Sequence, residues 1–118
     1  MDKITFLHYP ACNTCRKAQK WLGENKIDYT PRHIVDDKPN AEELKKWIQT
    51  SGLPLKKFFN TSGIVYKEMN LKEKLPTMSG DEQIELLASN GKLIKRPLVV
   101  TESKVFVGFK EEEWKNLK

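Results

Sequence analysis

The chain has 118 residues, a length typical of one domain, and a formal net charge of +5. Charged residues make up 31% of the chain, and no apolar run approaches the roughly 20 residues that a membrane-spanning helix needs. Lysines and glutamates alternate instead of forming one basic block, which argues against direct nucleic-acid binding. The apolar run near the N-terminus is too short for a signal peptide. We therefore expect a soluble, cytoplasmic protein with one domain over residues 1–118 and no membrane contact.

The first third of the chain alternates between strand and helix patterns. The apolar run of residues 4–7 predicts a buried strand, and residues 15–25 carry apolar side chains at helical spacing. Residues 27–35 predict a second strand, in which Pro31 favours a sheet edge or a bend. A strand–helix–strand unit of this length predicts two parallel strands.

The middle of the chain, about residues 40–90, predicts helices. An Asn-x-x-Glu pattern that begins at Asn40 is typical of a helix start, and Gly52 is typical of a helix end. A Ser-Gly-Asp-Glu run from Ser79 predicts a second capped helix, which we expect to close at Gly91.

The last third of the chain predicts a hairpin and a helix. Residues 98–100 and 105–107 are β-branched or apolar and are joined by a short polar link. Three glutamates from Glu111 predict the first turn of a final helix. The resulting order predicts an α/β, thioredoxin-like fold with a four-stranded mixed sheet. Its helical insertion, about residues 40–90, separates the βαβ half from the ββα half.

A Cys-x-x-Cys motif, Cys12 to Cys15, lies between the first strand and the first helix. The thiolate is the reactive form of cysteine, and free N–H groups at a helix start stabilise it. We expect Cys12 to be the attacking thiol and Cys15 to be the resolving thiol, one turn further into the helix. Arg16 and a protonated His8 would add positive charge nearby.

An arginine–proline pair, Arg96-Pro97, precedes the third predicted strand. In thioredoxin-like folds a cis-proline at this position packs beside the dithiol, and only an X-Pro bond adopts the cis form at low cost. A cis bond at Pro97 would bring Arg96 next to Cys12, where its guanidinium could bind an oxyanion or the thiolate. The alternative is an exposed arginine before an ordinary trans proline.

The sequence offers no recognisable metal site. Two cysteines cannot fill the four positions of a tetrahedral zinc site, and the spacing of the only histidines, His8 and His33, matches no zinc pattern. We expect no bound metal and no bound cofactor.

Three groups of motifs together resemble the arsenate reductase-like family. That family contains the ArsC-type, glutaredoxin-coupled arsenate reductases and the Spx/MgsR redox regulators. The resemblance covers nearly the whole chain. The motifs are His8–Arg16, Phe58–Thr61 with Tyr66–Glu68, and Lys95–Pro97 with Val107–Phe109.

The resemblance implies roles for individual residues. Cys12 corresponds to the thiol that attacks arsenate, Arg96 to one anion-binding arginine, and His8 to a group that lowers the thiol pKa. The ArsC pattern brings two further arginines to the anion, at positions where this chain has Asn60 and Gly108. ArsC-type enzymes also usually carry a serine at the position of the second cysteine.

Two functions therefore remain open. The first is a thiol-dependent reductase of a small oxyanion or a protein disulfide, with glutathione and glutaredoxin, or thioredoxin, as the electron donor. The second is a redox-sensing regulator of the Spx/MgsR type, in which a glycine matching Gly52 takes part in binding RNA polymerase.

Overall fold

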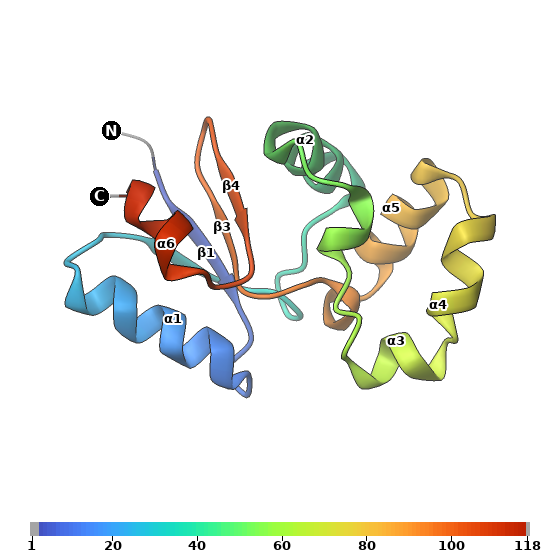
Figure 1. Cartoon of the computed structure of the whole chain (residues 1–118), viewed down its shortest axis with the longest axis horizontal. Helices are drawn as coiled ribbons and strands as arrows, with labels where there is room; N and C mark the ends of the chain where they lie inside the picture. Colours follow the sequence, from blue (N-terminus) through green and yellow to red (C-terminus); the bar gives the residue numbers. More distant parts are fainter. Residues whose placement is uncertain (1–2, 118) are drawn as a thin grey trace.

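The computed structural model describes residues 3–117. Its centre is a four-stranded sheet with strand order β2-β1-β3-β4 (Figure 1). Strand β1 pairs parallel with β2 and antiparallel with β3, and β3 pairs antiparallel with β4. This mixed sheet confirms the predicted fold class. The strands are β1 (Thr5–His8), β2 (Thr30–His33), β3 (Leu98–Val100) and β4 (Val105–Val107).

Six α-helices and short 3-10 segments complete the described part of the chain. Helices α1 and α6 pack against the same face of the sheet, whereas α2 to α5 form a separate helical half (Figure 1). The helices are α1 (Asn13–Glu24), α2 (Ala41–Ser51), α3 (Ile64–Glu68), α4 (Leu71–Lys74), α5 (Gly80–Ser89) and α6 (Glu111–Trp114). The 3-10 segments are η1 (Leu55–Phe58), η2 (Leu75–Thr77), η3 (Gly91–Leu93) and η4 (Lys115–Leu117).

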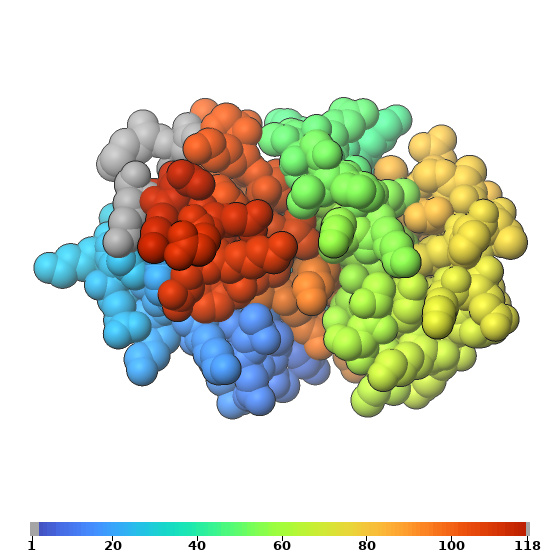
Figure 2. All heavy atoms as spheres, in the orientation of Figure 1, coloured from blue at the N-terminus to red at the C-terminus, as the bar shows by residue number. Residues whose placement is uncertain are grey.

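The molecule is elongated, with principal extents of 43 × 27 × 25 Å. In the space-filling view the N- and C-terminal segments form one half and the insertion forms the other (Figure 2). Within residues 3–117 no helix combines the length and the apolar character needed to span a bilayer.

Strand β2 is shorter than the predicted range of residues 27–35. Lys26 adopts a left-handed conformation, and the N–H of Ile27 donates to the carbonyl of Leu22, so the residues after α1 complete its C-terminal turn. At the other end, the N–H of Asp37 closes a turn on the carbonyl of His33. Pro31 lies on an edge strand, as the sequence predicted.

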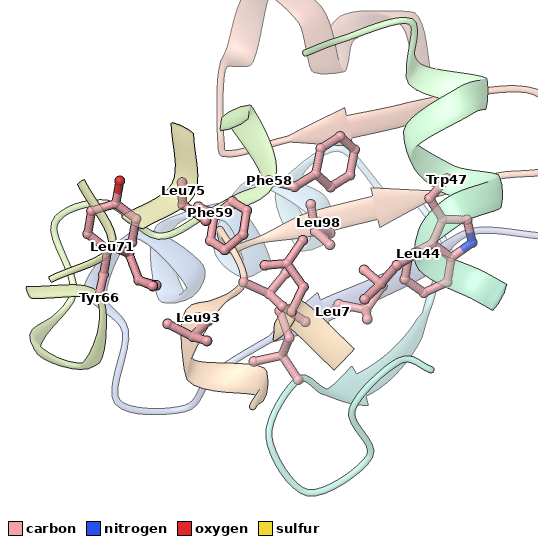
Figure 3. Packing of buried hydrophobic residues seen from close by; sticks show 13 residues of the cluster. Leu7, Leu44, Trp47, Phe58, Phe59, Tyr66, Leu71, Leu75, Leu93 and Leu98 are labelled. Carbon is pink, nitrogen blue, oxygen red and sulfur yellow. The ribbon is translucent and has the colours of Figure 1, made fainter. Parts of the chain in front are cut away.

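The two faces of the sheet bury different clusters because successive strand residues point to opposite sides. Phe6 and Val99 pack with Leu22 of α1 and Trp114 of α6. Their strand neighbours Leu7 and Leu98 point the other way, into a larger cluster that the insertion covers. Figure 3 shows this larger cluster.

The insertion begins its two main helices, and ends the first of them, where the sequence predicts. Asn40 and Ser79 both form capping boxes, with Glu43 and Glu82 as the reciprocal acceptors. Gly52 ends α2 in a left-handed conformation with φ of 67°.

The prediction that Gly91 closes the helix after Ser79 was wrong. Helix α5 ends at Ser89, and Asn90 caps the following 3-10 segment, whose first residue is Gly91. Gly91 is buried, and a Cβ there would overlap the backbone of Ile34 and Val35. A glycine is needed at this point because two backbone segments approach each other closely.

A bidentate salt bridge joins the sheet edge to the insertion. The guanidinium of Arg32 on β2 binds both carboxylate oxygens of Glu43 on α2, at 2.7 and 3.0 Å. Its Nε also donates to the carbonyl of Asp37, and its centre lies 5.8 Å from the ring of Trp47. This geometry uses the planar fork of arginine, which a lysine could not reproduce.

A second connection is made through the backbone. The N–H of Asn60 donates to the carbonyl of Leu93, and the N–H of Lys95 donates to the carbonyl of Phe58, both at 2.7 Å. Together they form an antiparallel bridge between Phe59 and Ile94. The residues just before Arg96 are therefore held by the insertion.

Candidate active site

The dithiol lies at the N-terminus of α1. Cys12 is the N-cap residue, in extended conformation, and the N–H of Cys15 donates to its Sγ at 3.3 Å. The backbone of Cys12 is held in turn, because its N–H donates to the carbonyl of Tyr9 at 2.9 Å. Helix α1 starts two residues earlier than predicted, since Cys12 itself supplies the cap.

The environment favours the thiolate form of Cys12. Burial has the largest influence and by itself would raise the pKa of this thiol. Hydrogen bonds from Cys15 and Arg96, and the positive charge of Arg96, together outweigh burial and lower the pKa below its usual 9.0. Cys12 is half-buried, so this residue is partly open to solvent.

Cys15 has the opposite character. Its side chain is 2% exposed, and burial raises the pKa of its thiol to about 12. A backbone hydrogen bond with Tyr9 opposes this effect, whereas the nearby sulfur of Cys12 adds to it. The two thiols therefore differ: Cys12 is partly exposed with a lowered pKa, whereas Cys15 is buried with a raised pKa, one turn into the helix.

Arg96 reaches the dithiol from the segment before β3, the strand that pairs with β1. The Arg96–Pro97 peptide bond is cis, as the sequence predicted, and Pro97 is buried directly before β3. The guanidinium lies 4.8 Å from the ring centre of Tyr9, within cation–π range. Its Nη1 donates to the carbonyl of Lys92 at 3.4 Å. The alternative of an exposed arginine before a trans proline was wrong.

The other two supporting residues occupy the same end of β1 and α1. His8 stacks on Phe6 with ring centres 5.2 Å apart, and burial, followed by the charge of His33, lowers its pKa below the usual 6.5. The Nε of Arg16 donates to the carbonyl of Pro10 at 2.9 Å and braces the loop. The expectation that either residue assists the Cys12 thiolate stays a prediction.

Asn60 and Gly108, which the family resemblance aligns with two further arginines, each have a structural role in this chain. Asn60 lies in the backbone bridge and accepts from the Ser62 hydroxyl at 3.4 Å. Gly108 is buried with φ of 76°, and its N–H donates to the carbonyl of Pro97 at 2.9 Å. The left-handed backbone at Gly108 disfavours any residue with a Cβ.

Gly52 lies apart from this cluster, at the end of α2 in the insertion. A Cβ at this position would meet no other atom within 4 Å, so the glycine borders open space. Leu53, the next residue, has an exposed fraction of 39%. The helix-end role of Gly52 is confirmed, and its role in binding a partner stays a prediction.

Tyr9 is a site residue that the sequence analysis did not single out. It contacts Arg96 through its ring and holds both cysteines through its backbone. Its place between a strand and the Cys-x-x-Cys motif was visible in the sequence. That the ring faces Arg96 depends on a contact between segments far apart in the chain.

His33 also has partners that the sequence does not indicate. Its Nδ1 accepts from the backbone N–H groups of Val35 and Asp36, at 3.2 and 3.0 Å, and its ring lies 6.4 Å from that of His8. Within residues 3–117 no group of three His, Cys, Asp or Glu side chains is placed to hold a metal ion.

Comparison with known proteins identifies the family. The model of the ArsC family matches residues 7–117. The chain belongs to the ArsC family. This confirms the resemblance that the three groups of motifs predicted.

The relatives of this ArsC-family chain differ in what is known of them. It is 59% identical to the uncharacterized protein YusI of Bacillus subtilis (strain 168), over 94% of each chain. It is 32% identical to the regulatory protein MgsR of the same organism, over 95% of this chain and 87% of that protein. A solved ArsC family related protein from Bacteroides fragilis shares 70% identity, with a TM-score of 0.97 over 98% of both chains.

Proposed function

We propose that this ArsC-family chain is a thiol-dependent reductase of disulfides, with Cys12 as nucleophile and Cys15 as resolving thiol. The observation that carries the proposal is the contrast between the two sulfurs. Cys12 is accessible and has a lowered pKa, whereas Cys15 is buried and has a raised one. Such a pair favours attack by one defined sulfur and later resolution by the other.

In the first step the Cys12 thiolate attacks one sulfur of a substrate disulfide. A bond forms between Cys12 and that sulfur, and the substrate S–S bond breaks. The other half of the substrate leaves as a thiolate and takes up a proton from water. The positive charge of Arg96 lies beside the sulfur that reacts and stabilises the thiolate before attack.

In the second step Cys15 attacks Cys12. Once Cys12 is bonded to substrate it carries no negative charge, so its contribution to the raised pKa of Cys15 disappears. Cys15 then loses its proton to solvent, its sulfur bonds to Cys12, and the remaining half of the substrate leaves as a thiolate. The dithiol has lost two electrons and the substrate has gained two.

A reductant must then restore the dithiol. Thioredoxin, or glutathione with glutaredoxin, would transfer two electrons to the Cys12–Cys15 disulfide by the same exchange chemistry. Arsenate, the small oxyanion that the family resemblance suggests, fits this site less well. Arg96 is the one arginine that remains of the three in the ArsC pattern, because Asn60 and Gly108 replace the others.

The test uses hydroxyethyl disulfide and two variants. With Cys15→Ser we expect a stable mixed disulfide on Cys12, visible as one added half of the reagent by mass spectrometry. The unchanged protein should instead form the internal disulfide and release two thiols. Cys12→Ser, which keeps the buried thiol, should react at least about a hundredfold more slowly, because Cys15 is buried and burial, the largest influence on it, disfavours its thiolate with or without Cys12.

Two outcomes would contradict the reductase. One is a Cys12→Ser variant that reacts as fast as the unchanged protein. The other is efficient arsenate reduction with glutathione and glutaredoxin that exceeds disulfide reduction and is lost in Arg96→Ala.

A second candidate function is a redox-sensing regulator that binds RNA polymerase. It is supported by the 32% identity to the regulatory protein MgsR and by the open surface at Gly52 and Leu53. Purified bacterial RNA polymerase should then bind the chain, and Gly52→Arg should weaken binding. Gly23→Arg is the matched control, since Gly23 also borders open space but lies on α1. Equal binding by all three proteins, or no binding, would exclude this function.

A further inference from the structure

A cavity of about 180 Å³ lies in the helical half of the molecule, formed by residues of the insertion alone. Residues from five of its segments line it: η1, α3, α4, η2 and α5. None of the described lining residues is acidic, and none belongs to the dithiol site. The lining residues are Lys56, Tyr66, Lys72, Leu75, Pro76 and Gln83.

The walls of the cavity combine an apolar surface with hydrogen-bond donors. Leu75 and the ring of Tyr66 are buried, and the Tyr66 ring packs edge-on against Phe59 at 6.2 Å. Figure 3 shows the Tyr66 hydroxyl at the edge of the buried cluster. Within residues 3–117 this hydroxyl makes no hydrogen bond, and no buried side-chain polar atom of this part lacks a partner, so the hydroxyl itself is open to solvent although its ring is buried.

Two ammonium groups complete the cavity. Lys56 and Lys72 form no ion pair with any residue that the structure describes. Gln83 is fixed, because its Nε2 donates to the carbonyls of Leu75 and Met78 at 3.1 and 3.3 Å. Two unpaired positive charges and one free hydroxyl beside an apolar wall form an environment for an anion with an apolar body.

We propose that this cavity binds a small carboxylic acid with an apolar body. The carboxylate accepts from Lys56, Lys72 and the Tyr66 hydroxyl, and the body lies against Leu75 and Pro76. The volume of about 180 Å³ is below the range of roughly 300–1,000 Å³ for drug-sized ligands, so a single ring or short branched chain is the appropriate size. The site is separate from the dithiol and does not depend on the proposed reductase activity.

The test is a titration of the isotope-labelled protein with benzoate, followed by amide chemical shifts. Benzamide, which has the same shape and no charge, is the matched neutral ligand. We expect benzoate to shift amides of α3, α4 and α5, and benzamide to shift them much less. The titration should extend to about 10 mM, which covers millimolar dissociation constants.

Variants then separate the cavity from general attraction of anions to a basic protein. Lys56→Gln and Lys72→Gln should each weaken benzoate binding about threefold, and Tyr66→Phe should weaken it by a similar factor while keeping the buried ring. Lys74→Gln is the control, since Lys74 lies on the same helix as Lys72 but does not line the cavity. It should leave binding unchanged.

Three results would overturn the proposal. They are the absence of benzoate shifts in α3 to α5, binding of benzamide as tight as that of benzoate, and equal weakening by Lys74→Gln and Lys72→Gln. Binding that is weakened by the lining variants alone supports it.

Discussion

The two faces of the sheet are stabilised in different ways. On the α1 face, five buried residues of the described chain form a cluster in which Trp114 contacts the rings of Phe6, Trp21 and Phe109 edge-on. On the other face, thirteen buried residues form a cluster that extends through the insertion (Figure 3). The helix that carries the dithiol rests on the smaller cluster. The geometry around the two cysteines therefore depends on few side chains.

The largest expected effect comes from removing one leucine from each cluster. Leu22 of α1 and Leu44 of α2 are both fully buried, so Leu22→Ala and Leu44→Ala should each lower the free energy of unfolding by about 3–4 kcal/mol. Urea unfolding measures this loss. Alkylation of Cys12 against pH should distinguish the two variants, because Leu22 anchors α1, the helix whose N-cap is Cys12, whereas Leu44 lies in the insertion. Equal alkylation profiles for the two variants would show that the clusters do not divide the molecule in this way.

A glycine pair compares the close contact behind β2 with the open surface of α1. Gly91→Ala forces a Cβ into the backbone of Ile34 and should lower the free energy of unfolding by about 2–3 kcal/mol. Gly23→Ala places a Cβ in open space inside a helix and should raise it by about 0.5–1 kcal/mol. Thermal or urea unfolding measures both. A tolerated Gly91→Ala would show that the two backbone segments can separate at little cost.

The charge at the dithiol can be tested with two arginines, Arg96 beside the Cys12 sulfur and Arg16 on the first turn of α1. Arg96→Gln removes a hydrogen bond and a positive charge from Cys12, so the pKa of the thiol should rise and alkylation at pH 7 should slow about fivefold. Arg16→Gln should change the rate less, since the Arg16 side chain is bonded to the Pro10 carbonyl. Rates of iodoacetamide modification across a pH series measure both variants. The reverse order of effects would assign the stabilising charge to Arg16.

The smallest effect on stability is expected at the Arg32–Glu43 salt bridge between β2 and α2. Arg32 lowers the pKa of the Glu43 carboxyl by hydrogen bonding, burial opposes this, and the Asn40 N–H adds to the lowering. The carboxylate therefore stabilises the fold above its ordinary pKa of 4.5, and this contribution is lost as pH falls through the lower pKa of the folded state. Glu43→Gln, which keeps the capping geometry, should cost about 0.5–1 kcal/mol at pH 7.

Unfolding followed over pH should show the Glu43→Gln protein approaching the unchanged protein as the solution becomes acidic. Glu42→Gln is the control, because Glu42 is an exposed neighbour on α2. A cost that is independent of pH would mean that the charge of Glu43 contributes nothing.

Local patterns in the sequence were sufficient for much of the fold. The capping boxes at Asn40 and Ser79 depend on residues three apart, and the edge position of Pro31 follows from its missing N–H. The cis bond before Pro97 was predictable from its place before the third strand. These features are set by neighbouring residues or by strand order.

The features that escaped prediction depend on distant segments. Gly91 was read as a helix end, whereas its conformation is required by the backbone of Ile34. The ring of Tyr9 faces Arg96 only because β1 and β3 are adjacent in the sheet. The cavity at Tyr66 requires five short segments to pack together. No local spacing encodes such contacts.

The backbone bridge between Phe59 and Ile94 has a consequence for the order in which the chain folds. Its two hydrogen bonds join segments far apart in sequence, and closing so long a loop has an entropic cost that only later contacts recover. The strand–helix–strand unit with both cysteines is local and can form before that loop closes. We therefore expect the dithiol to exist during folding before Arg96 reaches it. Pulse-labelling of Cys12 during refolding would reveal an early period in which this thiol has an ordinary acidity.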